Sequence, residues 1–306
     1  MNPAFSVVLL TTLTGAGQGL FLALFGAELA GVASPTFLAS GAAVALLLAA
    51  LGLLASFFHL GHPERAWRAA AMWRTSWLSR EVIALPLFMA GLAAWGTAHL
   101  LGWPGTRLLG AVVALLSLAL FVCTAMIYAA IKFLREWAHP LTLINYTLLG
   151  CASGFTLATM LAALLAPELL RPCALGAALL TLAGMFTRML SLRRNASLKP
   201  KSTLQTALGI KHPRIVQKSQ GFMGGSFNTR EFFHGKSALF LRNIKGLFLV
   251  LAFVLPIAML LAGARGGSPL WFALVFALQY VGLLAERWYF FAQANHPQNL
   301  YYQAIS

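Results

Sequence analysis

The sequence predicts an all-α fold, a polytopic membrane protein in which eight transmembrane helices form one bundle. Hydrophobic residues make up 59% of the 306 positions and charged residues only 9%, whereas a typical water-soluble domain carries about 25% charged residues. The mean hydropathy is +0.78. Eight separate stretches are also apolar and long enough to cross a hydrocarbon core, which takes about 20 residues.

Each expected span follows from an apolar run and from what interrupts it. We expect spans at residues 5–30, 35–60, 81–101, 108–131, 141–166, 173–192, 244–263 and 269–291. Pro and Gly interrupt the chain at residues 103–105, 166–167 and 266–269, as they do in turns, and basic connections fill the wider gaps. Frequent Gly and Ala within the runs let helices approach closely in lipid. Residues 1–306 are therefore expected to form a single integral membrane domain.

The basic residues are distributed unevenly between the two ends of the expected bundle. Twenty-two Lys and Arg stand against seven acidic residues, and the net charge is +15. On a soluble fold this excess would indicate nucleic acid, but here the basic residues lie between apolar runs, so no nucleic-acid partner is expected. All except Arg107, Arg171 and Arg265 fall on one side of the membrane. By the positive-inside rule, that side and both termini are cytoplasmic.

The cysteines and histidines do not form a metal or haem pattern. Cys123, Cys151 and Cys173 are far apart in apolar stretches, so we interpret them as small core residues. Haem needs paired axial ligands at one depth, and His99 is expected at the opposite membrane face from His59. We therefore expect no haem and no metal in this chain.

The densest group of polar residues joins the second span to the third. His59 follows the second apolar run and Glu81 opens the third, so both are expected where the membrane meets the cytoplasm. An imidazole titrates near neutral pH and can bond a ring oxygen, and a partly desolvated carboxyl group can relay another proton. This pair suits a quinone, a lipid-soluble carrier of electrons and protons. The other residues expected in this quinone-binding site are Arg65, Arg68, Trp77, Ser79 and Arg80.

The same residues also have simpler explanations. His59 can cap its helix by bonding late carbonyl groups, and Glu81 can favour the N-terminal dipole of the next helix. The tryptophans can form an interfacial belt. Arg65 and Arg68 share a face if their segment is helical, and there they can dock an acidic partner.

Residues 193–243 are expected to be a long basic cytoplasmic loop that docks a partner subunit. The stretch is too apolar for a solvated linker and mixes basic with aromatic residues. Its Gly235-Lys236-Ser237 imitates the end of a phosphate-binding loop, but that motif needs Gly where this chain has Arg230. The residues expected to contact the partner, here and in the second connection, are His62, Arg74, Arg214, Phe222, Phe227, Arg230, Phe232, Phe233 and His234.

Polar residues also occur within the expected spans. Glu28 lies near the outer end of the first span, where we expect its side chain to reach the interface. Glu286 and Arg287 are adjacent near the cytoplasmic end of the last span. We expect them to form an ion pair within that helix.

Three of these blocks resemble a known family. Residues 59–68, 76–81 and 286–291 read HLGHPERAWR, SWLSRE and ERWYFF, and they look like the membrane anchor subunits of dimethyl sulfoxide reductase. The blocks agree with that family in order and spacing. The resemblance covers nearly the whole chain.

The resemblance implies a role in electron transfer in the bacterial inner membrane. Anchors of this family carry no cofactor of their own, hold a molybdopterin catalytic subunit through an iron-sulfur subunit, and bind ubiquinone or menaquinone. For the family's quinol-site histidine and acidic residue, the resemblance implies His59 and Glu81. The basic insertion is similar to that of anchors of cytoplasmic sulfite dehydrogenases, which implies electron flow from sulfite to the quinone pool. The alternative is a quinol-oxidising anchor of a terminal reductase.

Two other classes of function stay open. A secondary transporter also has several spans with intramembrane polar groups, but such transporters often show internal repeats, and this sequence shows no convincing repeat. A purely structural anchor would hold the partner subunits in the membrane lipids without a quinone site.

Overall fold

The computed structural model describes residues 1–216, 218 and 234–301. Every regular element in these ranges is helical, which confirms the all-α class. Some of the residues expected to dock a partner lie outside the described residues: Phe222, Phe227, Arg230, Phe232 and Phe233.

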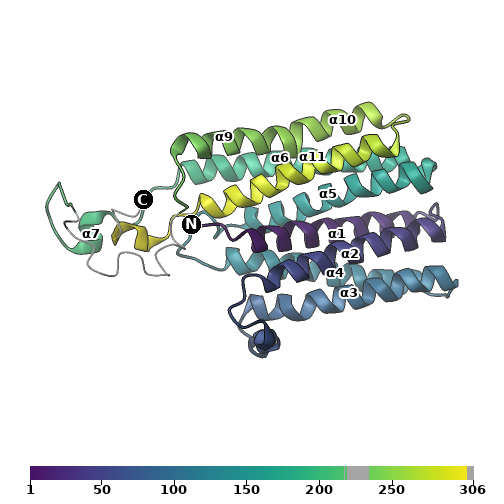
Figure 1. The fold of residues 1–306 in the computed structure, drawn as a ribbon, viewed down its shortest axis with the longest axis horizontal. Coiled ribbons are helices and arrows are strands. Elements are labelled where there is room, and N and C mark those ends of the chain that lie inside the picture. Colours follow the sequence, from purple (N-terminus) through teal and green to yellow (C-terminus); the bar gives the residue numbers. More distant parts are fainter. Residues whose placement is uncertain (217, 219–233, 302–306) are drawn as a thin grey trace.

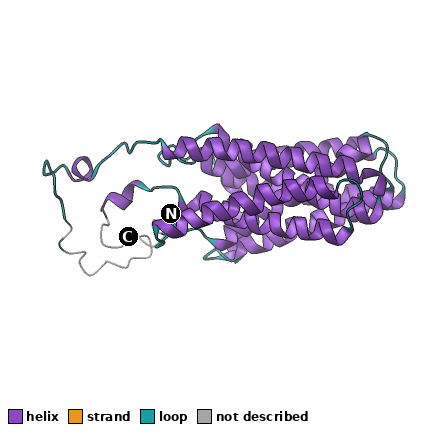
Figure 2. Ribbon diagram, turned by 90° about the horizontal axis from the view of Figure 1, so that it is seen from above, coloured by secondary structure: helices purple, strands orange, loops and turns teal. Residues whose placement is uncertain are grey.

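Long helices run side by side along one axis (Figures 1 and 2). The spans are α1 (Phe5–Leu29), α2 (Pro35–Phe57), α3 (Trp77–Leu101), α4 (Thr106–Ala129), α5 (Pro140–Leu165), α6 (Leu170–Ala196), the continuous run of α9 (Ala238–Leu249), η3 (Val250–Val254) and α10 (Leu255–Gly263), and α11 (Pro269–Ala292). The shorter elements are η1 (Pro63–Met72), η2 (Pro167–Leu169), α7 (Leu204–Leu208) and η4 (Pro297–Tyr301). Within the described residues, 8 helices are long and apolar enough to cross a membrane, so the predicted number of spans is confirmed.

Serine caps set where several helices begin. The Ser34 hydroxyl accepts a backbone N–H in the first turn of α2, and Pro35 takes the first helical position, which suits the fixed φ of proline. Ser76 caps α3 in the same way. Helix α3 therefore begins at Trp77, and Glu81 lies one turn inside it. The expected start at Glu81 was wrong because Ser79 and Arg80 interrupt the apolar run, whereas the helix itself begins at the Ser76 cap.

The long connection is shorter than the expected loop. Helix α6 continues to Ala196 and α9 begins at Ala238, so both ends of residues 193–243 are helical. The connection itself spans residues 197–237 and contains α7.

Helix α1 is the innermost span. Of its most apolar window, 78% is buried, against 33% to 67% for the other spans. Gly19 of α1 and Gly154 of α5 face each other so closely that a Cβ on either would collide with the backbone of the other helix. Small residues permit this approach where lipid supplies no hydrophobic drive.

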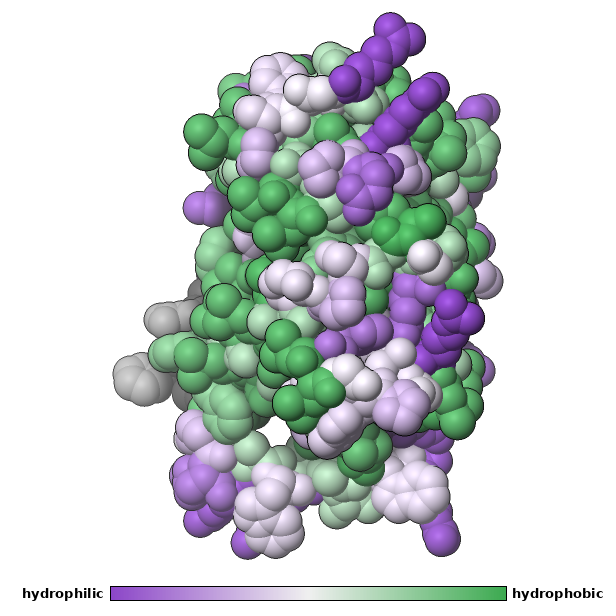
Figure 3. Space-filling model, turned by 90° about the vertical axis from the view of Figure 1, so that its right-hand side faces the viewer, coloured by the Kyte–Doolittle hydropathy of each residue, from purple (hydrophilic) through white to green (hydrophobic). Residues whose placement is uncertain are grey.

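The two ends of the bundle differ in charge. The N-terminal ammonium of Met1 donates to the carbonyl oxygens of Ala292 at 3.4 Å and Ala294 at 2.9 Å, so α1 starts where α11 ends. We call this the basic end, and it also carries residues 58–76, 130–139 and 197–216 (Figure 1). At the opposite end, hydrophilic residues lie in scattered groups among hydrophobic ones (Figure 3). Its Lys and Arg residues are Arg107, Arg171 and Arg265.

Candidate functional site

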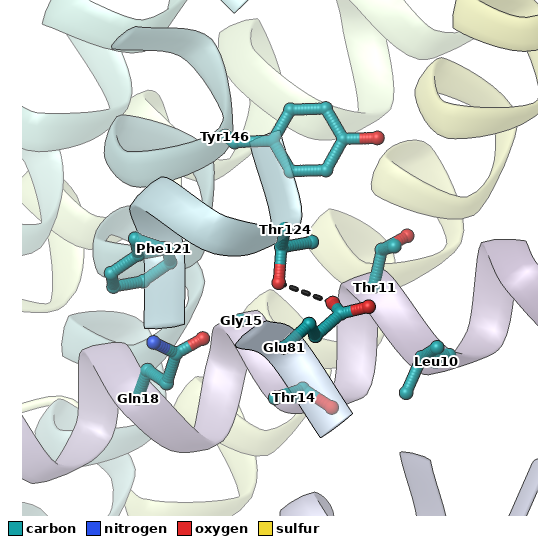
Figure 4. Close-up of a pocket in the computed structure, with 9 residues that line it drawn as sticks. All are labelled: Leu10, Thr11, Thr14, Gly15, Gln18, Glu81, Phe121, Thr124 and Tyr146. Carbon is teal, nitrogen blue, oxygen red and sulfur yellow. Dashed lines mark hydrogen bonds between the residues drawn. The ribbon is translucent and has the colours of Figure 1, made fainter. Parts of the chain in front are cut away.

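A small polar cavity lies inside the bundle near the basic end, between α1, α3, α4 and α5 (Figure 4). At about 10 Å³ it has room for roughly one water molecule. The lining residues are Leu10, Thr11, Thr14, Gly15, Gln18, Glu81, Phe121, Thr124 and Tyr146.

Glu81 supplies the carboxyl group of this cavity. It is 7% exposed, and the Thr124 hydroxyl donates to its Oε1 at 2.5 Å (Figure 4). The Thr14 hydroxyl oxygen on the same wall is buried without a hydrogen-bond partner in the described part of the chain. The cavity has room for a water beside the carboxyl group, and buried polar groups are usually satisfied by protein or by ordered water.

His59 lies just beyond the end of α2 at the basic end. Its side chain is largely exposed, and its Nδ1 lies 3.2 Å from Ser6 Oγ in the first turn of α1. Loss of part of its hydration lowers the pKa of His59 from the ordinary value. The shift favours the neutral imidazole.

The two central residues of the predicted site contact one face of α1. Ser6, which bonds His59, and Leu10 and Thr14, which line the Glu81 cavity, recur every four residues, a spacing that places side chains on the same side of a helix. His59 therefore sits along the α1 face that leads to Glu81, about one helical turn closer to the basic end. The structure arranges the pair in line along α1.

Arg65 and Arg68 lie on η1 and are exposed. In a 3₁₀ helix, residues three apart are eclipsed, so the two arginines share a face, as expected for a helical segment. Arg65 Nε lies 3.6 Å from Glu64 Oε1, and the Arg68 guanidinium lies 5.5 Å from the centre of the Trp67 ring. Both cations remain accessible to an acidic partner or a ligand at the membrane surface.

Trp77, Ser79 and Arg80 form the first turn of α3. The Arg80 guanidinium stacks on the Trp77 ring at 4.2 Å and donates to the carbonyl oxygens of Trp73 at 2.9 Å and Arg74 at 2.8 Å. Ser79 is buried. Arg80 thus fixes the turn that joins η1 to α3, and it holds the start of the helix that carries Glu81.

The described partner-docking residues lie at the basic end. His62 Nδ1 is 3.0 Å from Glu64 Oε1, and the Arg74 guanidinium lies 5.4 Å from the Trp73 ring centre. These residues and Arg214 are exposed.

His234 is half-buried, and its ring packs on Trp288 of α11 with the ring centroids 6.2 Å apart. Burial is the largest cause that lowers the pKa of His234. The end of the long connection is therefore fastened to the bundle beside α11.

The expected ion pair within the last helix is present, but it is the longer of two ion pairs that Glu286 makes. The closest cation to Glu286 is Arg188 of α6, whose Nε lies 2.7 Å from Oε1, whereas Arg287 Nε lies 3.9 Å from Oε2. Arg188 and Glu286 are each 1% exposed. The Arg188–Glu286 pair joins α6 to α11, and a single sequence does not reveal that these two helices are neighbours.

The expectation that the Glu28 side chain reaches the membrane interface was wrong. Glu28 is 7% exposed. Its Oε1 lies 3.2 Å from His99 Nε2, and the Trp95 indole donates to its Oε2 at 3.1 Å. Glu28 therefore belongs to a buried polar group that joins α1 to α3 at the end opposite the basic end.

Sequence reasoning missed most of the cavity wall. Thr11, Thr14 and Gln18 follow one another at a helical spacing on α1, and this polar stripe in an apolar span was the available signal. Thr124 and Tyr146 stand on different helices. No spacing in the chain connects them to Glu81.

Comparison with known proteins agrees with this architecture. The family described as DMSO reductase anchor subunit (DmsC) matches residues 1–214. The chain is also 53% identical over 325 residues to a subunit of the sulfite dehydrogenase of Allochromatium vinosum, and the match covers 100% of both proteins. The protein is therefore a multi-pass membrane protein that belongs to the DMSO reductase anchor subunit family.

Proposed function

We propose that this chain passes electrons between an iron-sulfur partner subunit and quinone in the bacterial inner membrane, and that sulfite oxidation supplies them. Family membership and the full-length similarity to a sulfite dehydrogenase subunit support the assignment. Molybdopterin and the iron-sulfur clusters belong to the partner subunits in this proposal. Among the described residues, no group of three or more His, Cys, Asp or Glu side chains could hold a metal ion.

The arrangement of His59 and Glu81 along one face of α1 carries the proposal. A cavity with room for one water is too small for a quinone ring, so we place the ring outside it, against His59 and Ser6. The exposed imidazole can bond a ring oxygen there, and Glu81 can exchange a proton through the cavity. Arg65 and Arg68 lie on η1 at the same end of the bundle, Trp77, Ser79 and Arg80 hold the start of α3, and all five complete the proposed site.

The chemistry balances with protons from one side of the membrane. Sulfite and water give sulfate, two electrons and two protons, and a quinone takes up two of each to become a quinol. If the basic end is cytoplasmic, as its charge predicts, both half-reactions exchange protons with the cytoplasm. The proposed turnover then moves no net charge across the membrane.

The basic end also provides the proposed docking surface for the iron-sulfur subunit. His62, Arg74 and Arg214 are exposed there, and His234 holds the end of the connection against α11. Exposed arginines suit an acidic partner surface because the guanidinium group binds carboxylates in a bidentate manner.

Replacement of the two central residues in the intact complex tests the proposal. We expect His59→Ala and Glu81→Gln to lower sulfite-dependent quinone reduction about 100-fold or more, the usual size of a lost acid-base group, with sulfite-dependent dye reduction by the catalytic subunit unchanged. Glu168→Gln is the control, since this carboxyl group is exposed and lies away from the cavity. Loss of both activities, or of neither, contradicts the proposal. If the intact complex oxidises quinol with an S-oxide as electron acceptor and does not oxidise sulfite, the chain instead serves a quinol-oxidising reductase.

A further inference from the structure

Three charged side chains are buried together beside the cavity without being part of its wall. Arg188, Glu286 and Arg287 are 1%, 1% and 4% exposed. The single carboxylate lies 2.7 Å from Arg188 and 3.9 Å from Arg287. The group therefore has one more positive than negative charge, and the excess lies on the Arg287 side, where the ion pair is longer.

Arg287 is directed toward the cavity. Its guanidinium lies 3.5 Å from the centre of the Tyr146 ring, a favourable position for a cation over an aromatic face. Tyr146 lines the same cavity as Glu81. One aromatic ring thus separates the buried cation from the cavity that holds the carboxyl group.

An unbalanced charge inside a membrane protein is costly, so the excess on Arg287 calls for a counter-charge. The buried carboxyl groups in the described residues are Glu28, Glu81 and Glu286. Glu28 bonds His99 at the opposite end of the bundle, and Glu286 is shared by two arginines. Glu81 is the buried carboxyl group that remains.

We infer that Arg287 is a positioning residue for the cavity, and that its cation, acting across Tyr146, allows Glu81 to carry a negative charge inside the bundle. The inference deepens the proposed function, because a Glu81 that can ionise can release a proton and take up another. Arg287 is not among the residues that line the cavity, and it acts on Glu81 through Tyr146.

Other groups near Glu81 do not supply this charge. Helix α1 presents Thr11, Thr14 and Gln18, and α4 presents Thr124, Cys123 and Tyr128, all of them uncharged at neutral pH. Arg80 precedes Glu81 on α3, but its guanidinium is held by two loop carbonyl groups and by Trp77. It lies at the partly solvated start of the helix, where water screens its charge.

A double-mutant cycle on the full chain in its complex tests the coupling without reference to quinone. Arg287→Gln should lower the thermal unfolding temperature of the parent protein. In a protein that already carries Glu81→Gln, the same change should lower that temperature by at most half as much, because no Glu81 carboxylate is left without its counter-charge. Arg287→Lys should keep most of the stability. Arg107→Gln, at an exposed position on the opposite end, should cost the same in both backgrounds. An equal loss for Arg287→Gln in both backgrounds would overturn the inference.

If Arg287→Gln alone does not accumulate, the double variant decides. Accumulation of the double variant in the membrane supports the inference. If the double variant does not accumulate although the Glu81→Gln single variant does, the inference is overturned.

The pH profile of quinone-linked activity provides the functional readout. We expect Arg287→Gln to move the acid side of the profile to higher pH, and Arg287→Lys to restore it, because loss of the cation favours the neutral carboxyl group. If the double-mutant cycle shows coupling but the pH profile does not move, Arg287 still stabilises the charge of Glu81. Glu81 then takes no part in the proposed proton transfer. The two failures are therefore distinguishable.

Discussion

Thr124 of α4 donates a hydrogen bond to Glu81 of α3 at 2.5 Å inside a buried cavity. The bond fixes one carboxyl oxygen on the α4 side of the cavity. It links the two helices at the level of the proposed proton transfer, so its removal should affect both stability and rate.

Thr124→Val keeps the shape of the side chain and removes the donor. We expect it to lower the free energy of unfolding by about 1–3 kcal/mol, the usual cost of an unpaired buried polar group, and to slow quinone reduction more than dye reduction. Thr124→Ser should recover most of both. Thr147→Val is the matched control, since the hydrogen bond of that hydroxyl among the described residues goes to the carbonyl oxygen of Leu143 in its own helix. Equal behaviour of the two valine variants would refute the role of this hydrogen bond.

The close contact between α1 and α5 should not tolerate a methyl group. Gly154→Ala places a Cβ against the backbone of Gly19, and overpacking of this kind costs about 3 kcal/mol. We expect poor accumulation in the membrane and a lower unfolding temperature in detergent. Gly26→Ala, where a Cβ meets open space, should be neutral by the same measurements.

The buried group at the opposite end should contribute to stability alone. Glu28→Gln breaks the pairing with His99, and loss of one partner of a buried pair costs about 3–5 kcal/mol. We expect a lower unfolding temperature with an unchanged rate of quinone reduction per folded complex. A variant with normal stability and a reduced rate would show instead that this end takes part in turnover.

The partial loss of hydration at His59 should make this residue a source of acid sensitivity. Because the folded protein holds the pKa of His59 below its ordinary value, the unfolded chain binds more protons on the acid side of that value, and stability falls as the pH drops. Thermal unfolding of the parent and of His59→Gln, measured between about pH 7 and pH 5, should show a steeper acid decline in the parent. Parallel curves would show that this imidazole contributes no proton linkage.

Much of the architecture can be predicted from the sequence because a segment that crosses the hydrocarbon core must be apolar along its length. A run of about 20 apolar residues has few alternatives to a spanning helix, and the eight spans are confirmed. The start of α3 was less accessible because Trp77 and Arg80 interrupt the apolar pattern, although Ser76 is a recognisable cap.

Polar contacts between different helices could not be predicted from the sequence. Arg188 and Glu286 are 98 positions apart, and neither residue's helical spacing points to the other. The Glu28 group was missed for the same reason, because a carboxyl group near a helix end has the same local pattern whether it reaches water or a neighbouring helix. His59 and Glu81 were proposed from chemistry and family resemblance, and the threonines beside Glu81 became visible only when α1, α3 and α4 were placed together.

The central position of α1 also affects how the protein is made. Helix α1 leaves the ribosome before the other seven spans, yet the finished bundle encloses it most completely, and its Gly19 contact requires α5, whose Gly154 is translated much later. Thr11, Thr14 and Gln18 are therefore without their final neighbours during early insertion. We therefore expect α1 to reach its final packing only when the fifth span is inserted, and substitutions at the contact to reduce the amount of protein before any complex assembles.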